Sequence, residues 1–208
     1  MQGLEALLSA VALEGPDGVA AGEYAKQVQS ADDWELYEQA LMRHLQQVAG
    51  DDAKLGRAYL ELARVQGEAM QRSDKAIGTL EFGIAEVKQN LTLRLALGER
   101  LRAQGLADQA GVVFRQAAGL YPASPDPWRG LVQCYVDRGK MAEAALGLGP
   151  LCVLGAASES DMRALTRMTP SRPPRPPTRS RPRCCGPSSI AASRARWPRS
   201  SSTRSCSA

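Results

Sequence analysis

The sequence predicts an all-α fold, an α-solenoid of stacked antiparallel helix hairpins with a disordered C-terminal tail. Apolar and small residues recur with a period of 34 along residues 91–158, a spacing typical of repeated helix pairs. Only 5% of the residues are aromatic, whereas Ala and Leu are abundant, which favours closely packed helices over a sheet. After residue 168 the helical periodicity stops and the balance of charge changes sign.

Residues 1–30 predict an N-terminal helical segment that precedes the repeats. Residues 4–13 fit a short helix, and the turn Gly15-Pro16-Asp17-Gly18 separates them from a weakly patterned stretch at 19–29. The next helix is amphipathic, with Asp32 and Asp33 placed to cap it. Its apolar face carries Trp34, Tyr37, Leu41 and Leu45. We interpret this helix as the second helix of a further degenerate repeat.

Two repeats, 91–124 and 125–158, superimpose position by position. The matching residues are Leu97, Gly98, Leu101, Gly105, Ala110, Phe114 and Ala117 in the first, and Leu131, Val132, Tyr135, Gly139, Ala144, Leu148 and Leu151 in the second. In each repeat the first three positions lie on a first helix, and the glycine at the fourth position, Gly105 or Gly139, ends that helix. The last three positions form an i, i+4, i+7 stripe on a second helix. We therefore predict two helix hairpins.

A third, degenerate repeat is predicted at about 56–90, inside a repeat domain that spans 31–168. Its second helix is in register, because Ala76 and Leu80 lie 34 positions before Ala110 and Phe114. Its first helix is offset, because Leu62 lies 35 positions before Leu97. The offset predicts one extra residue in the turn around Gln71 to Ser73. A last helix is expected at about 159–167, where Ser158 with Asp161 resembles an N-cap.

The pattern W-x2-L-G-x2-Y, then A-x3-F and a closing Pro, resembles the tetratricopeptide repeat family. One half of the pattern is carried by Trp128, Leu131 and Tyr135, and the other half by Leu97, Gly98, Ala110, Phe114 and Pro122. The sequence departs from it at Arg94, Val132 and Ala156, in place of the leading aromatic, the small residue and the closing Pro. The resemblance implies a protein-protein interaction scaffold whose first helices line a concave wall.

By this resemblance, the residues that bind a partner polypeptide lie on the first helices. They are Arg64, Leu95, Glu99, Arg102, Arg129, Gln133 and Val136, within a wall that also carries Arg57, Leu60, Thr92, Asp126 and Asp137. Chaperone-docking members of the family clamp a terminal carboxylate with paired Asn and Lys or Arg, and Asn is absent from these positions. One alternative stays open: these are solvated charges on an array whose groove lies in a missing continuation.

The residues predict no enzyme, and we expect no catalytic, cofactor or metal site. The single histidine, His44, has no Ser or Cys motif beside it, so we expect a surface or half-buried helix residue. Asp51-Asp52 precedes a predicted helix, where carboxylates accept backbone N–H groups. Cys134 and Cys152 follow the helical pattern as small hydrophobes. Trp128 is expected to pack within its hairpin rather than to bind a partner.

The N-terminus lacks the basic residues of a secretory signal, and no apolar run approaches the roughly 18 residues of a membrane span. The five cysteines show no disulfide or zinc-site spacing, which favours a reducing compartment. We therefore expect a cytoplasmic protein, of bacterial origin, without a membrane span.

Residues 169–208 carry nine Arg, no Lys and no acidic residue, whereas residues 1–168 carry 17 basic and 22 acidic residues. We expect this tail to be disordered. The abrupt change suggests out-of-frame translation of a GC-rich gene. The alternatives are a tether that contacts nucleic acid non-specifically and a Pro-rich ligand at Pro173-x-x-Pro176.

Two functions remain open at this stage. The first is a scaffold that binds a partner polypeptide through the repeats. The alternative is the interaction or targeting portion of a larger enzyme or regulator whose catalytic part is missing from this chain.

Overall fold

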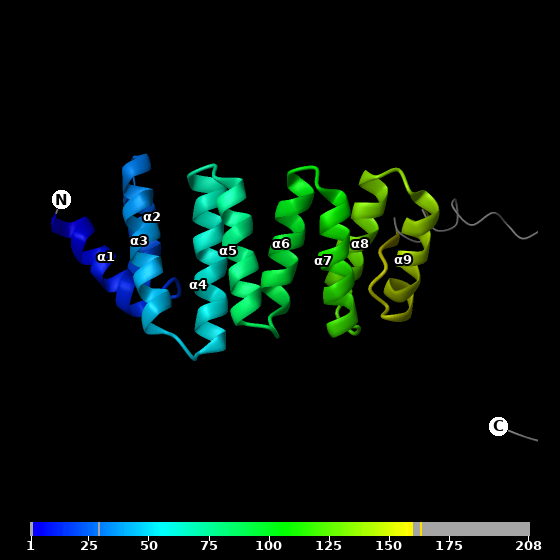
Figure 1. Cartoon of the computed structure of the whole chain (residues 1–208), viewed down its shortest axis with the longest axis horizontal. Helices are drawn as coiled ribbons and strands as arrows, with labels where there is room; N and C mark the ends of the chain where they lie inside the picture. Colours follow the sequence, from blue (N-terminus) through cyan, green and yellow to red (C-terminus); the bar gives the residue numbers. More distant parts are fainter. Residues whose placement is uncertain (1, 29, 160–162, 164–208) are drawn as a thin grey trace, which may run out of the picture. The chain divides into compact units, whose positions relative to one another are not determined.

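The computed structural model describes residues 2–28, 30–159 and 163 (Figure 1). In chain order, its elements are α1 (Gln2–Glu14), α2 (Val19–Gln27), α3 (Ala31–Gln47), α4 (Asp52–Arg64), the π-helix η1 (Val65–Ala69), α5 (Ser73–Glu86), α6 (Leu91–Ala103), α7 (Ala107–Leu120), α8 (Pro125–Asp137) and α9 (Met141–Val153). These described residues contain helices and no strand, and each helix from α4 onward packs against the next. The predicted all-α solenoid is confirmed.

The chain divides into two units, residues 1–170 and 171–208. All of the described residues belong to the first unit. The predictions for the tail lie outside the described residues, as does most of the helix expected at 159–167. None of the helices described is long and apolar enough to cross a membrane.

Phe114 of α7 is the centre of the larger hydrophobic cluster, which joins α4 to α8. Its ring is 1% exposed. A Cβ added at Gly98 of α6 or at Gly130 of α8 would overlap this ring. The two glycines therefore let the helices on either side of α7 approach the same aromatic side chain. The first helices α6 and α8 are followed by Gly105 and Gly139, whose φ angles of 78° and 70° suit glycine at the turns inside the hairpins.

A second hydrophobic cluster holds α1, α2 and α3 together and extends to α4 and η1. Within it the rings of Tyr24 and Tyr37 stack with centroids 5.2 Å apart. His44 also belongs to this interior: it is 2% exposed, and its Nδ1 lies 3.2 Å from the carbonyl oxygen of Ala12. The expectation of a surface or half-buried His44 is therefore wrong. The ring is buried because α1 packs on α3 and because Gly15 lies directly against it.

The caps of α3 and α4 test the predicted roles of the aspartate pairs. Asp51 accepts the Lys54 N–H at 3.1 Å, as predicted, and this bond lowers the pKa of the Asp51 carboxyl. The cap of α3 is instead Ser30, whose Oγ accepts the Asp33 N–H at 3.2 Å. Asp33 in turn accepts the Ser30 N–H at 3.1 Å. Asp33 is thus the reciprocal partner in a capping box, three residues after the cap.

The extra residue of the degenerate repeat is accommodated inside a helix. The Met70 N–H donates to the Val65 carbonyl at 3.0 Å, five residues back, and such a turn holds one residue more than an α turn. The sequence placed this residue in the turn at Gln71 to Ser73, whereas the structure places the widened turn upstream, in η1. Gln71 then reverses the chain with a φ of 54°.

The widened turn directs Gln66 of η1 into the interior, where it joins three elements. Its Nε2 donates to Glu38 of α3 at 2.7 Å, and its Oε1 accepts from Thr79 of α5 at 2.7 Å. Glu38 also pairs with Lys75 at 2.6 Å. Because the amide of this buried side chain is bonded at both ends, η1 is tied to the helices before and after it.

Candidate functional site

The first helices of the repeats, α4, α6 and α8, carry all seven predicted partner-binding residues. Five of them line one pocket of about 410 Å³ between α6 and α8, together with Asp126 and Gly130: they are Leu95, Glu99, Arg102, Arg129 and Gln133. We call this the α6/α8 pocket. Arg64 lines a different pocket, described below. Val136 is partly buried on α8 and lines neither of these two.

Arg102 joins the two walls of the α6/α8 pocket. Its Nη2 lies 2.9 Å from Glu99 on the same helix, and its Nη1 lies 3.3 Å from Asp137 on α8. The hydrogen bonds that Arg102 donates to Glu99, followed by the charge of Glu99 and the contact with Asp137, raise the pKa of the Arg102 guanidinium. Arg102 therefore helps to hold the hairpins in place, besides facing the pocket.

Arg129 presents more of its side chain to solvent, with 52% of it exposed. Its Nη1 lies 3.3 Å from Asp126, and its Nη2 donates to the Ala156 carbonyl at 2.9 Å. Gln133, one turn further along α8, is exposed and donates to Asp137 at 3.1 Å. Arg129 and Gln133 are therefore exposed residues of the α6/α8 pocket.

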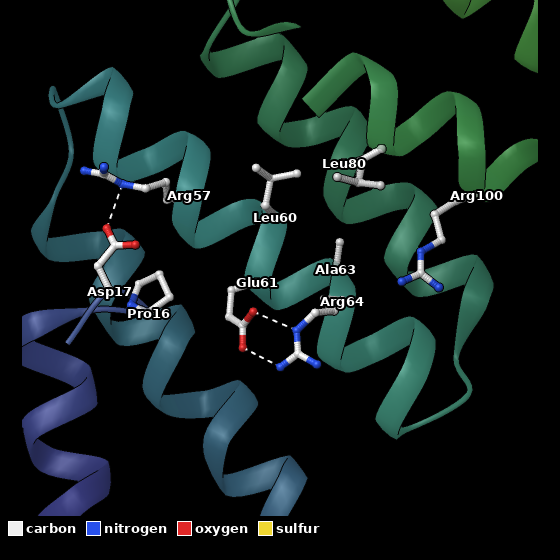
Figure 2. Close-up of a pocket in the computed structure, with 10 residues that line it drawn as sticks. Pro16, Asp17, Arg57, Leu60, Glu61, Ala63, Arg64, Leu80 and Arg100 are labelled. Carbon is white, nitrogen blue, oxygen red and sulfur yellow. Dashed lines mark hydrogen bonds and ion pairs between the residues drawn. The ribbon is translucent and has the colours of Figure 1, made fainter. Parts of the chain in front are cut away.

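A second pocket, of about 400 Å³, lies where α4, α5 and α6 meet the turn that follows α1 (Figure 2). We call it the α4/α6 pocket. Its floor is apolar and its rim is charged. The floor consists of Leu60, Ala63, Leu80 and Ala96, and the rim consists of Pro16, Asp17, Arg57, Glu61, Arg64 and Arg100.

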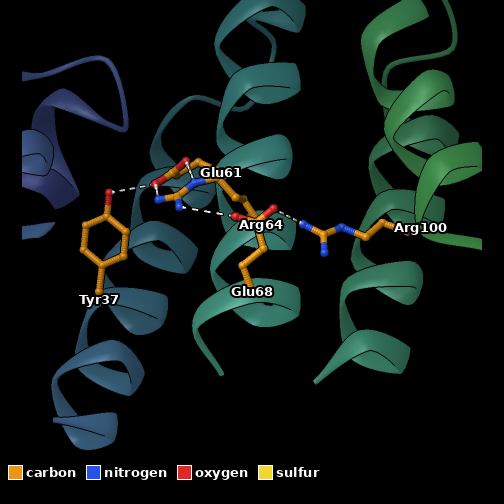
Figure 3. A network of polar contacts seen from close by, with 5 residues as sticks. All are labelled: Tyr37, Glu61, Arg64, Glu68 and Arg100. Atoms are coloured by element: carbon orange, nitrogen blue, oxygen red, sulfur yellow. Dashed lines mark hydrogen bonds and ion pairs between the residues drawn. The ribbon is translucent and has the colours of Figure 1, made fainter. Parts of the chain in front are cut away.

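A continuous series of polar contacts runs along one side of the α4/α6 pocket (Figure 3). Tyr37 donates to Glu61 at 3.4 Å, and Glu61 accepts two hydrogen bonds from Arg64, at 2.7 and 2.8 Å. Glu68 of η1 lies 3.7 Å from Arg64 and 2.6 Å from Arg100 on α6. The contacts thus link α3, α4, η1 and α6 across the predicted wall.

The same contacts shift two pKa values. Burial, followed by the charge of Glu61, raises the pKa of the Tyr37 hydroxyl. The bidentate hydrogen bonds that Arg64 donates to Glu61, followed by the charges of Glu61 and Glu68, raise the pKa of the Arg64 guanidinium. Arg64 therefore stays charged throughout the ordinary pH range.

Four rim residues of the α4/α6 pocket were missed by the prediction: Pro16, Asp17, Glu61 and Arg100. The spacing of Glu61 and Arg64, three positions apart, was a local signal that a charge pair would form on one helix face. Asp17 had no such signal, because it reaches Arg57, at 2.7 Å, only through the packing of the N-terminal helices.

The residues that were interpreted as structural lie in the interior or at its edge. Trp128 is partly buried against the larger cluster, and its Nε1 donates to the Pro122 carbonyl at 3.3 Å. Cys134 is 1% exposed. Burial, followed by the charge of Asp137, raises the pKa of its thiol to about 11.

We expect Cys134 to resist alkylation in the folded protein at mildly alkaline pH. The thiolate is the reactive form, and the raised pKa keeps the thiol protonated under these conditions. Treatment with iodoacetamide, followed by peptide mass mapping, should show slow labelling of Cys134 in buffer and fast labelling in guanidinium chloride. Equally fast labelling in both would contradict the burial of this side chain.

Comparison with known protein families agrees with the helical-repeat fold. Residues 101–150 match the model of a family described as tetratricopeptide repeat. The matched segment contains α7 and α8 entirely, together with the end of α6 and most of α9. It includes Ala110, Phe114, Trp128 and Tyr135, so it confirms the resemblance drawn from those positions. No curated protein matches the chain.

Proposed function

We propose, from the premise that this chain carries tetratricopeptide repeats, that it is a protein-protein interaction scaffold of the cytoplasm with no catalytic role of its own. In this proposal it binds a segment of a partner polypeptide along the wall formed by α4, α6 and α8. The observation that carries the proposal is the α6/α8 pocket, because residues from two repeats converge on one open concavity there.

The chemistry of the α6/α8 pocket suits a polypeptide segment. Arg129 and Gln133 offer hydrogen-bond donors to backbone carbonyls, and Glu99 and Asp126 offer acceptors to backbone N–H groups. Leu95 supplies an apolar surface between them. Donors, acceptors and apolar area in one groove are what recognition of an extended chain requires.

The proposal is tested by replacing Arg129 and Gln133, two exposed residues of α8, with glutamate. Arg102 is unsuitable for this purpose, because its loss would also break the contact with Asp137 that joins α6 to α8. We expect the double variant Arg129→Glu/Gln133→Glu to remain folded and to lower the affinity for a partner by about tenfold, or ~1.4 kcal/mol. The partner is recovered by pull-down with the full chain, and its affinity is measured by calorimetry.

The matched control is Gln116→Glu, an exposed residue of α7 that does not line the α6/α8 pocket. It should leave the affinity unchanged. A partner that binds the wild-type chain and the double variant equally well must use another surface, and the proposed wall would then be abandoned.

A further inference from the structure

We infer that the α4/α6 pocket takes one apolar side chain, of leucine or phenylalanine size, from a partner segment that needs no acidic residue there. This inference rests on the proposed function, because it specifies the chemistry of the wall at a second position.

The floor can receive a side chain because two of its four members are alanines. Ala63 of α4 and Ala96 of α6 line the pocket together with Leu60 and Leu80. Small residues at these positions leave a concavity of about 400 Å³, within the range of roughly 300 to 1,000 Å³ in which proteins bind ligands. Ala63 and Leu80 are already 2% and 1% exposed, whereas Leu60 and Ala96 are half-buried. An apolar side chain placed on this floor therefore removes its own surface and that of Leu60 and Ala96 from water.

Each arginine of the rim is paired with an acidic residue of the same chain. Arg57 pairs with Asp17 at 2.7 Å, Arg64 with Glu61 at 2.7 Å, and Arg100 with Glu68 at 2.6 Å. These three pairs leave no net charge among their six residues, so a partner carboxylate would meet no positive charge that is not already compensated. The charge of the rim therefore gives an acidic segment little advantage over a neutral one.

The same arginines can still bind a neutral backbone. A guanidinium carries five N–H donors, and one carboxylate accepts at most a bidentate pair of them in the plane of the group. The side chain of Arg57 is 52% exposed, and it meets Asp17 through Nε. Its terminal nitrogens can therefore donate to a backbone carbonyl of a segment whose side chain lies on the floor.

The turn after α1 closes one end of the pocket. Pro16 and Asp17 line it, and Asp17 is held there by Arg57. Gly15, with a φ of 81°, lies against the buried imidazole of His44, so the base of the turn is packed on the interior. A closed end and an apolar floor suit a single anchoring side chain.

The test uses four synthetic pentapeptides, acetylated and amidated, with the sequence Gly-Ser-Xaa-Ser-Gly, in which Xaa is Leu, Phe, Ala or Glu. Each is titrated into the full chain, and the methyl resonances of Leu80 and Ala96 are followed by NMR. We expect saturable shifts with the Leu and Phe peptides that persist when salt is added. The Ala and Glu peptides should bind at least roughly tenfold more weakly, which corresponds to the loss of one anchoring contact. Tighter binding of the Glu peptide, or no saturable shift with any peptide, would overturn the inference.

A pair of matched variants locates the binding. Ala96→Leu adds a side chain on the floor and should abolish the shift of Leu80 with the Leu peptide. Ala85→Leu adds the same side chain at an exposed position of α5 outside the pocket lining and should leave the shift unchanged. Circular dichroism verifies that both variants are folded. Equal binding by the two variants would place the peptide elsewhere.

A failure of this inference can be distinguished from a failure of the proposed function. A partner recovered by pull-down that is weakened by Arg129→Glu/Gln133→Glu but not by Ala96→Leu would overturn the anchor inference and leave the scaffold in place. If neither set of substitutions changed the affinity of the partner, the proposal that the partner binds along this wall would be abandoned.

Discussion

Replacement of Ala110 by arginine should destabilise the repeats by about 3 kcal/mol or more. Ala110 is 0% exposed on α7 and belongs to the larger hydrophobic cluster. A guanidinium at this position would either force the neighbouring helices apart or remain in the interior without its solvation. Urea unfolding followed by circular dichroism measures the change in the free energy of unfolding.

The matched substitution is Gln109→Arg, one residue earlier on the same helix. Gln109 is exposed, so the same guanidinium remains in water and the change should stay within about 0.5 kcal/mol. Equal destabilisation by the two variants would show that the buried face of α7 has been assigned wrongly.

Phe114→Ala should cost about 3 to 5 kcal/mol, as large-to-small changes of buried aromatic side chains do. The ring lies against Gly98 of α6 and Gly130 of α8. Neither glycine has a side chain that could move into the space left by the ring, so the cavity would collapse poorly. Alanine is also the best helix former, which means that a loss of stability must come from packing and not from helix propensity.

Because Gly130 lines the α6/α8 pocket as well, Phe114→Ala should also loosen that pocket and weaken partner binding. The control is Gln116→Ala on the exposed side of α7, which should change the free energy of unfolding by less than about 0.5 kcal/mol. A cost below about 1 kcal/mol for Phe114→Ala would contradict the role of this ring as the contact shared by α6, α7 and α8.

The repeated hairpins could be predicted from the sequence because their signal is local. Leu97, Leu101, Ala110 and Phe114 fall on helix faces that the 3.6-residue period defines, and all four are buried. The turns at Gly105 and Gly139 have the positive φ angles expected of glycine after a helix. The placement of Leu95, Glu99, Arg129 and Gln133 on first helices follows from the same period, although their role in binding stays a prediction.

Other features depended on how the helices meet, and local patterns do not encode that. One extra residue between α4 and α5 fits either a longer turn or a π-helix, and only the buried contacts of Gln66 with Glu38 and Thr79 select η1. His44 is an ordinary helix residue in the sequence, yet the packing of α1 over α3 buries it.

The sequence by itself therefore determined the helical fold and which face of each repeat helix is apolar, because periodicity indicates the side of a helix that avoids water. Only the tertiary structure decided that Asp17 reaches Arg57 and that Glu68 reaches Arg100, at 2.7 and 2.6 Å. These pairs join residues 40 and 32 positions apart in the chain. Their formation depends on the distance and register between packed helices, which no spacing within one helix specifies.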